Sequence, residues 1–316
     1  MKKYLLNKPM FIILLTVLAF VLALKIIFHS EYQTKLPSYD VSVLCAKGDA
    51  EQFKNFRQGA LQASEDLNVN LRFLYSDAED GVNHQLKFLE QELNNDSDAM
   101  IMVPYCDHSM LLKKCDDANK PIVYAYSHVI KGESNYVGAD GAMMGNDFAQ
   151  SIITTHPQKQ QIAILVRNDL THMENEMVKS TIDALRSQGN QLEVLSFHPQ
   201  ESSEHLHHLL SKKDYDIVIC FADELFGQLI EHKAIHNIEI YAMGSNYNII
   251  NALEKEDIRA LLVQDDYSIG YLSVKAIVDS LQKGNSIVKQ KIRYAIVDKN
   301  AMYQSVNERL LFPIVR

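Results

Sequence analysis

The chain has 316 residues, 31 Lys and Arg against 40 Asp and Glu, a formal charge of -9 and a pI near 5.7. This length allows two domains of ordinary size, each with its own core. Proteins that bind nucleic acid need clustered basic residues to neutralise phosphates, so the acidic balance argues against a nucleic-acid partner.

Near the N-terminus, three lysines precede an apolar stretch, Met10–Leu24. Lys25 and further apolar residues follow it. Because Lys25 can extend its ammonium to the headgroups, residues 10–28 approach the roughly 20 that a bilayer requires. We expect a transmembrane signal-anchor at 10–28, with residues 1–9 in the cytoplasm and the bulk of the chain extracytoplasmic at the cell membrane. A cleaved signal peptide is the alternative, although the small residues of a cleavage site are missing.

Residues 29–38 are expected to form a linker, after which short apolar strands alternate with amphipathic helices. This alternation is typical of parallel βαβ units. In the first unit, Val41–Phe56, a polar loop at 47–53 separates strand from helix, with Asp49 as a candidate helix cap. Ligands bind beyond the carboxyl ends of such strands, so we expect this loop to form one wall of a ligand site.

Two series of elements follow one another along the chain. The first contains helix 51–67, strand 71–75, helix 82–93, strand 99–104, helix 105–119, strand 122–126, strand 136–137 and helix 143–154. The second contains strands 162–166, 192–197, 217–221, 238–243 and 261–263, with helices 175–188, 203–212 and 224–232. A last helix, 268–282, and a last strand, 292–297, remain, which implies lobes joined by several crossings and a hinged cleft between them.

Four cysteines raise the question of disulfides. If 105–119 is helical, Cys106 and Cys115 lie about 13 Å apart at about 1.5 Å of rise per residue, which excludes a bond between them. Cys45 and Cys106 end neighbouring predicted strands, so that pair is possible, and four buried thiols are the alternative. The histidines of the segment SSEHLHHLL are interpreted as a solvated helix face and not as a metal site.

Motifs of the common enzyme classes are missing from the sequence. We find no G-x-S-x-G nucleophile elbow, no Walker loop and no G-x-G-x-x-G fingerprint after the first strand. The segment KGDAEQF has a single Gly and cannot cradle a pyrophosphate. We therefore expect neither an enzymatic activity nor a cofactor.

Five segments occur in a recognisable order: FRQGALQASEDLNVNLRFL at 56–74, MIMVP at 100–104, NKPIVYAY at 119–126, YVGADGAMMGNDFA at 136–149 and VQDDYSIGYLSVKAIV at 263–278. Together the chain from 39 to 297 resembles the type I periplasmic binding proteins, the superfamily of ribose-binding proteins and lactose-repressor ligand domains. The resemblance implies an α/β fold of two doubly wound parallel-sheet lobes. The N-terminal lobe would be 39–140 plus 265–286 and the C-terminal lobe 141–264 plus 287–298, with a tail at 299–316.

The resemblance also implies which residues contact a ligand. The candidate ligand-binding residues are Asp49, Gln52, Phe53, Tyr126, Ser127, Arg167, Glu174, Asp223, Asn246 and Gln264. Phe53 matches an aromatic residue that stacks on a sugar face, with a core position as the alternative. Gln264 matches a ligand-contacting position at the hinge, and Asp223 either contacts ligand or caps its own helix.

Several of these positions depart from the pattern of the sugar-binding members. Gln52 stands where a second aromatic is usual, and Tyr126 and Ser127 replace an Asp-Arg pair. Carboxylates and Arg hold sugar hydroxyls best, so an ordinary sugar site is weakened. Glu174 and Glu176 would favour a cationic or amino-bearing ligand if they face the cleft, whereas an acidic first turn of an exposed helix is the alternative.

Taken together, the sequence predicts a membrane-tethered, extracytoplasmic substrate-binding protein that closes on a small sugar or sugar-like ligand. The partner would be an ABC transporter permease for uptake, or a histidine kinase for two-component signalling at the membrane. The alternative is an interaction module of the same fold that binds no ligand and acts as the partner of a membrane receptor.

Overall fold

The computed structural model describes residues 16–21, 38–47, 53–76, 81–107, 109–127, 136–197, 203–222, 225–233, 238–284 and 290–312. The chain divides into two units, Met1–Ser38 and Tyr39–Arg316. In the first unit residues 16–21 are helical. No helix among the described residues is both long and apolar enough to cross a membrane. Most of the expected anchor at 10–28 lies outside the described residues and stays a prediction.

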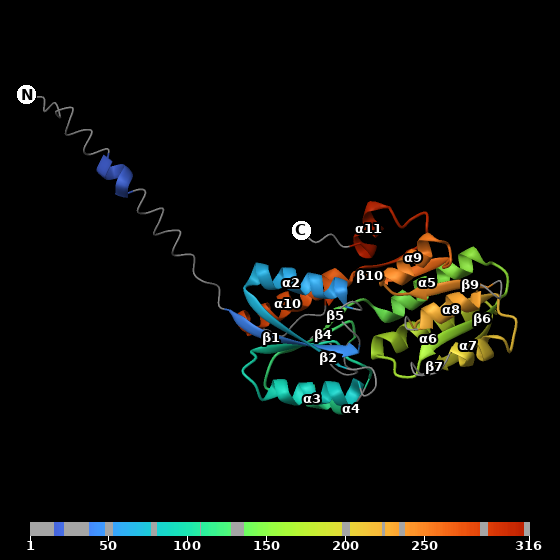
Figure 1. Ribbon diagram of the computed structural model, residues 1–316, viewed down its shortest axis with the longest axis horizontal. Coiled ribbons are helices and arrows are strands. Elements are labelled where there is room, and N and C mark those ends of the chain that lie inside the picture. The colour runs from blue at the N-terminus through green and yellow to red at the C-terminus, as the bar shows by residue number, and fades with distance from the viewer. Residues whose placement is uncertain are drawn as a thin grey trace, which may run out of the picture. The chain divides into compact units, whose positions relative to one another are not determined.

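Two sheets organise the second unit (Figure 1), each with six strands among the described residues. The first sheet has the order β11-β5-β4-β3-β1-β2. Its strands are β1 (Tyr39–Lys47), β2 (Val69–Ser76), β3 (Ala99–Met102), β4 (Ile122–Ala125), β5 (Tyr136–Gly138) and β11 (Gln290–Lys291). The second sheet has the order β12-β10-β9-β8-β6-β7. Its strands are β6 (Gln161–Arg167), β7 (Gln191–Phe197), β8 (Ile217–Cys220), β9 (Glu239–Met243), β10 (Ala260–Gln264) and β12 (Tyr294–Val297).

All pairings are parallel except that of β12 with β10. The helices between them are α2 (Lys54–Leu67), α3 (Gly81–Leu93), α4 (Ser109–Asp116), α5 (Gly141–Thr155), α6 (His172–Ser187), α7 (Ser203–Leu210), α8 (Phe226–Lys233), α9 (Tyr247–Glu254), α10 (Asp266–Lys283) and α11 (Ser305–Leu311). The predicted pair of doubly wound parallel sheets is confirmed.

Helices cover both faces of the first sheet, with α2 and α10 on one side and α3 and α4 on the other (Figure 1). Alternate residues of β1 therefore enter two different cores. Val41 and Val43 pack with Phe56 of α2, whereas Leu44 packs with Leu89 of α3. A strand buried on both faces reads as an uninterrupted apolar run, which is why the βαβ pattern was visible in the sequence.

The helices α2 and α10 are packed backbone to backbone. A Cβ atom on Gly59 would lie 1.9 Å from the carbonyl oxygen of Tyr267, and one on Gly270 would lie 1.9 Å from that of Phe56. Any larger side chain at either position must push the two helices apart. These contacts fix α10, which begins at the end of β10, onto the first lobe.

The chain crosses between the two sheets after β5, after β10 and after β11. The pairing of β11 with β5 places Gln290 and Lys291 in the first sheet, whereas the second lobe was expected to include 287–298. The chain then passes back to the second lobe between Ile292 and Arg293. Ile292 N still donates to Gly138 O at the end of β5, whereas Arg293 O accepts from Asp265 N at the end of β10. The hinge therefore consists of three adjacent strand ends.

Several helix boundaries differ from the sequence prediction, and two of these differences have a clear cause. The helix expected at 105–119 is observed as α4, Ser109–Asp116, because Tyr105 N donates to Gln85 Oε1 and Asp107 N donates to Leu170 O. The helix expected at 175–188 begins earlier, at His172, where Thr171 caps it. Both differences arise from tertiary and capping hydrogen bonds that the periodicity of apolar residues does not report.

The cysteines are free thiols, so the pair Cys45 and Cys106 is not bonded. Among the described residues no group of His, Cys, Asp and Glu is arranged to hold a metal ion.

Candidate functional site

A cavity of about 170 Å³ lies where the carboxyl ends of strands from the two sheets meet. From the first lobe it is lined by residues that follow β1, β3 and β4, among them Phe53, Tyr105 and Tyr126. From the second lobe it is lined by residues at or after the ends of β6, β8, β9 and β10, among them Arg167 and Gln264. This is the position at which doubly wound sheets bind ligands.

Aromatic rings form the wall contributed by the first lobe. The ring centroid of Tyr126 lies 6.3 Å from that of Phe53 and 5.6 Å from that of Phe56. Tyr126 has a φ of 68°, a left-handed conformation that a bulky residue rarely adopts. It is held there because its N donates to Val137 O and its carbonyl accepts from the hydroxyl of Tyr136. Strained backbone of this kind occurs preferentially at functional sites.

On the opposite wall Arg167 is held by two carboxylates. Its Nε lies 3.3 Å from Asp169 Oδ1 and its Nη2 lies 3.4 Å from Glu174 Oε2, while its side chain is only 10% exposed. The Asp169 carboxylate also accepts a hydrogen bond from the hydroxyl of Tyr105. Burial, followed by the charge and the hydrogen bond of Asp169, raises the pKa of Tyr105 to about 12, so this phenol stays protonated and donates.

Glu174 lines the cavity and also caps its own helix. Its Oε2 accepts from Thr171 N at 2.7 Å and from Thr171 Oγ1 at 2.9 Å, and the hydroxyl of Thr171 accepts from Glu174 N, which completes a capping box. Glu174 is therefore both a lining residue and part of an acidic first turn, and its contact with a ligand stays a prediction. Glu176 lies differently, 3.6 Å from Nε2 of His172 with 40% of its side chain exposed.

The floor of the cavity is at the hinge. Gln264 is 6% exposed, lines the cavity, and its Oε1 is shielded from solvent without a donor among the described residues. Two residues on, Asp266 Oδ2 accepts a hydrogen bond of 2.5 Å from Ser245 Oγ, and the hydroxyl of Tyr126 lies near the same carboxylate. Burial raises the pKa of Asp266 to about 6, against the lowering effect of these two donors.

Direct contacts bridge the lobes beside the cavity. Ser127 Oγ, which is 1% exposed, accepts from Met173 N at 3.1 Å, at the start of α6. Asp107 N donates to Leu170 O at 3.3 Å, and Nδ1 of His172 lies 3.9 Å from Asp107 Oδ2. The two lobes are therefore in direct contact beside the cavity.

Five of the ten sequence-predicted site residues line the cavity, namely Phe53, Tyr126, Arg167, Glu174 and Gln264. Ser127 forms the bridge described above. Asn246 caps α9 by accepting from Ile249 N at 3.0 Å and is not among the lining residues. Asp49, Gln52 and Asp223 lie outside the described residues. Their ligand contacts stay predictions.

Sequence reasoning missed Tyr105 and Asp266. Tyr105 follows Pro104 directly at the end of an apolar run, so the rule that ligands lie beyond strand ends could have found it. Asp266 follows the helix cap Asp265 and looks like an ordinary acidic first turn in the sequence. Its burial depends on Tyr126 and Ser245, which come from distant parts of the chain.

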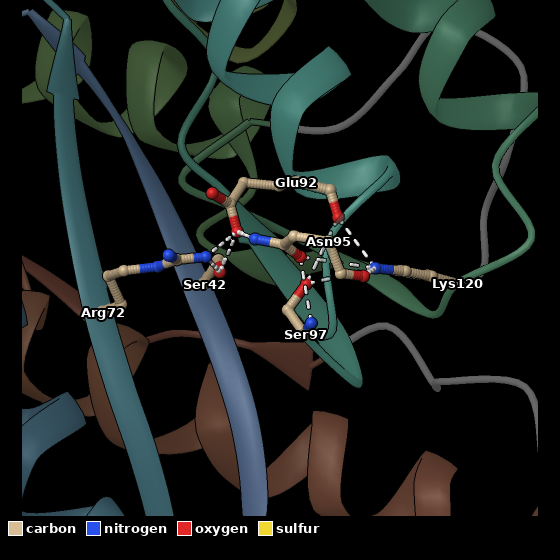
Figure 2. Close-up of polar contacts among 6 residues, drawn as sticks. All are labelled: Ser42, Arg72, Glu92, Asn95, Ser97 and Lys120. Carbon is tan, nitrogen blue, oxygen red and sulfur yellow. Dashed lines mark hydrogen bonds and ion pairs between the residues drawn. The ribbon is translucent and has the colours of Figure 1, made fainter.

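A second polar cluster lies at the other end of β1 and β2 (Figure 2). Glu92, at the end of α3, is 4% exposed, and its Oε2 accepts from Ser42 Oγ, from Asn95 Nδ2 and from the guanidinium of Arg72. Lys120 Nζ donates to the carbonyls of Glu92 and Asn95. These contacts tie α3 and the loop after it to the sheet, so we assign the cluster a structural role.

The sequence profile of the periplasmic binding protein domain matches residues 41–286. The chain belongs to the periplasmic binding protein family. Members of this family bind solutes and are not enzymes, in agreement with the function expected from the sequence. No curated protein matches the chain at a significant level.

Solved structures agree with this assignment. A solute-binding protein from Agrobacterium vitis with bound D-fucose has a TM-score of 0.78 at 16% identity, over 86% of this chain and 100% of that one. One from Agrobacterium radiobacter in complex with D-arabinose has a TM-score of 0.76 at 18% identity, over 88% and 100%. The XylFII-LytSN complex gives a TM-score of 0.74 at 14% identity, over 84% and 99%. At such identities the likeness shows the fold alone, and the predicted type I fold is confirmed.

Proposed function

We propose that the protein is a membrane-tethered, extracytoplasmic solute-binding protein whose lobes close on a small, sugar-like ligand. The observation that carries the proposal is the cavity between the strand ends, with the rings of Phe53 and Tyr126 on one side and the buried, unsatisfied Oε1 of Gln264 at its floor. A ring platform and a few fixed polar groups are what a small-ligand site requires.

The solved relatives support a sugar-like ligand. Two of them hold D-fucose and D-arabinose, which are compact rings with one polar edge and a more apolar face. An aromatic wall suits the apolar face of such a ring, and the hinge supplies an acceptor for a hydroxyl or amino group.

The tether and the partner rest on other observations. The apolar stretch 10–28, with lysines before it, favours a signal-anchor that leaves Tyr39–Arg316 outside the cell. Among the relatives, one is an ABC transporter solute-binding protein and another was solved in the XylFII-LytSN complex, so the fold is compatible with uptake and with a protein partner, for which we propose a histidine kinase. A chain that stays in the membrane fraction after alkaline extraction, and whose C-terminal part is cut by protease added to intact cells, supports the tether. A mature mass lacking the first 30 or so residues would instead indicate a cleaved signal peptide.

The ligand is tested by thermal unfolding of the protein against sugars, polyols and amino acids. A compound at 100 times its Kd stabilises the folded state by about 2.7 kcal/mol, which is readily seen as a shift in Tm. Phe53→Ala should abolish the shift, because it removes part of the ring wall. The control Phe73→Ala, whose ring stacks on Tyr75 of β2 away from the cavity, should keep it. A ligand shift that survives in Phe53→Ala would contradict the placement of the site.

One observation favours the interaction module as a second candidate function. The lobes are bridged by the protein's own groups, such as Ser127 and Met173 N, and Arg167 is already held by carboxylates. A module of this kind would give the same small-angle scattering curve with and without every compound of the screen. A ligand-dependent change of the curve would exclude it.

A further inference from the structure

Carboxylates outnumber cations in the cavity wall and directly behind it. Among the described residues, the charged side chains that line the cavity are Glu174 and Arg167, and the carboxylates of Asp169 and Asp266 lie next to Arg167 and Tyr126. Both carboxylates beside Arg167 lie within 3.4 Å of it, so its charge is already offset. In a shielded site an uncompensated carboxylate is costly, and a cation in the ligand would offset that cost.

The aromatic lining has the composition of a cation-binding cage. Phe53, Tyr105, Tyr126 and Phe221 all line the cavity. The faces of such rings carry negative electrostatic potential and attract ammonium groups. The Asp169 carboxylate lies beside the hydroxyl of Tyr105 and the Asp266 carboxylate beside that of Tyr126, and together with burial they raise the pKa of both phenols, so both rings stay neutral.

An acceptor without a partner points to the same ligand chemistry. Gln264 Oε1 is buried at the floor of the cavity and receives no hydrogen bond from the described residues. Buried acceptors are almost always satisfied, so a ligand donor is expected there. An ammonium group provides three donors and no acceptor, which suits a cavity rich in carboxylate and carbonyl oxygens.

We propose that the ligand carries a protonated amino group, as an amino sugar does, held against these rings with Glu174 as counter-ion. This inference rests on the proposed function, since it names the class of solute bound in the same cleft. It differs from the neutral sugars held by the solved relatives.

Glu174 can be tested without destroying the helix that it caps. Glu174→Gln removes the charge but keeps a capping box, because Gln serves at this position as well as Glu. Glu176→Gln is the matched control, since it lies on the same first turn, pairs with His172 and does not line the cavity.

The experiment is calorimetric titration of the full chain in detergent with D-glucosamine and D-galactosamine, their parents D-glucose and D-galactose, their N-acetyl forms, and choline as a non-sugar ammonium. We expect an amino sugar to bind at least about 10-fold tighter than its parent and its N-acetyl form, equivalent to about 1.4 kcal/mol. Glu174→Gln should remove this preference, and Glu176→Gln should retain it.

The outcomes separate this inference from the proposed function. If the parent sugars bind as tightly as the amino sugars, the proposal that the ligand carries an amino group is refuted. The proposed solute-binding function is then unaffected. If choline binds and the Glu174→Gln variant binds it more weakly, the site recognises an ammonium group. The proposal that the ligand is sugar-like is then refuted. Silence of every compound overturns both.

Discussion

Replacing the buried hinge carboxylate by its neutral isostere, Asp266→Asn, should stabilise the protein at neutral pH and not at acid pH. Burial raises the pKa of Asp266 from 3.8 to about 6 in the folded protein. The folded state thus holds this proton more tightly than the unfolded state does. The contribution of the group is most favourable below pH 3.8 and is lost as the pH rises through about 6.

The magnitude follows from the size of the shift. About two pKa units at 1.36 kcal/mol each give a difference of roughly 3 kcal/mol between the two ends of this window. The asparagine side chain of the variant would be neutral throughout while keeping an acceptor for Ser245 or Tyr126. By linkage, the variant and the wild type should therefore have nearly the same free energy of unfolding at a pH of about 4. At a pH of about 7 the free energy of unfolding of the variant should be higher by about 3 kcal/mol.

Urea unfolding of the fragment 38–316, followed by fluorescence and circular dichroism at half-unit pH intervals, measures this difference. The fragment contains the whole compact unit Tyr39–Arg316. Asp265→Asn serves as the control, since Asn caps α10 as well as Asp does; because the Asp265 charge is a minor cause of the raised pKa of Asp266, this variant should give a much smaller rise. An Asp266→Asn variant whose stability differs from that of the wild type by the same amount at every pH would show that the pKa of this carboxyl is not raised on folding, contrary to its buried setting.

Three further changes probe other parts of the molecule. Glu92→Ala should lower the free energy of unfolding by about 2 to 3 kcal/mol in the same urea assay, since it removes hydrogen bonds to a buried charge. The control Glu90→Ala, at an exposed neighbouring position, should change the free energy of unfolding by less than about 0.5 kcal/mol. Gly270→Ala should cost about 1 to 3 kcal/mol, because its Cβ would lie 1.9 Å from a backbone oxygen of α2, and a neutral result in thermal unfolding would refute the close packing. Ser127→Ala removes the acceptor of Met173 N and should shift the ligand-free protein towards an open form, detected as a larger radius of gyration; an unchanged radius would mean that this bridge does not hold the lobes.

The fold was predictable because its sheets are buried on both faces. Alternate residues such as Val43 and Leu44 enter different cores, so the strands appear as continuous apolar runs between amphipathic helices. The two-residue strand Gln290–Lys291 carries no such pattern. It forms only because β5 offers an edge beside it, so no local pattern assigns these two residues to the first sheet.

The family resemblance identified the site residues that occupy its ligand-contacting positions. Phe53, Tyr126 and Gln264 were proposed in this way, and all three line the cavity. Tyr105 could have been found from its place just beyond a strand end, whereas Asp266 could not, since its importance arises from partners far away in the sequence. The amides of Tyr105 and Asp107 are occupied by tertiary contacts, and a local pattern cannot report that.

The most direct test of ligand binding between the lobes is amide hydrogen exchange with and without the compound that gives the largest thermal shift. Protection should rise in the segments at the strand ends, 103–107, 167–174 and 264–270, where the cavity and the interlobe contacts lie. Protection confined to the opposite end of the first sheet, around Ser42 and Arg72, would place the ligand outside the cleft and contradict the proposed function.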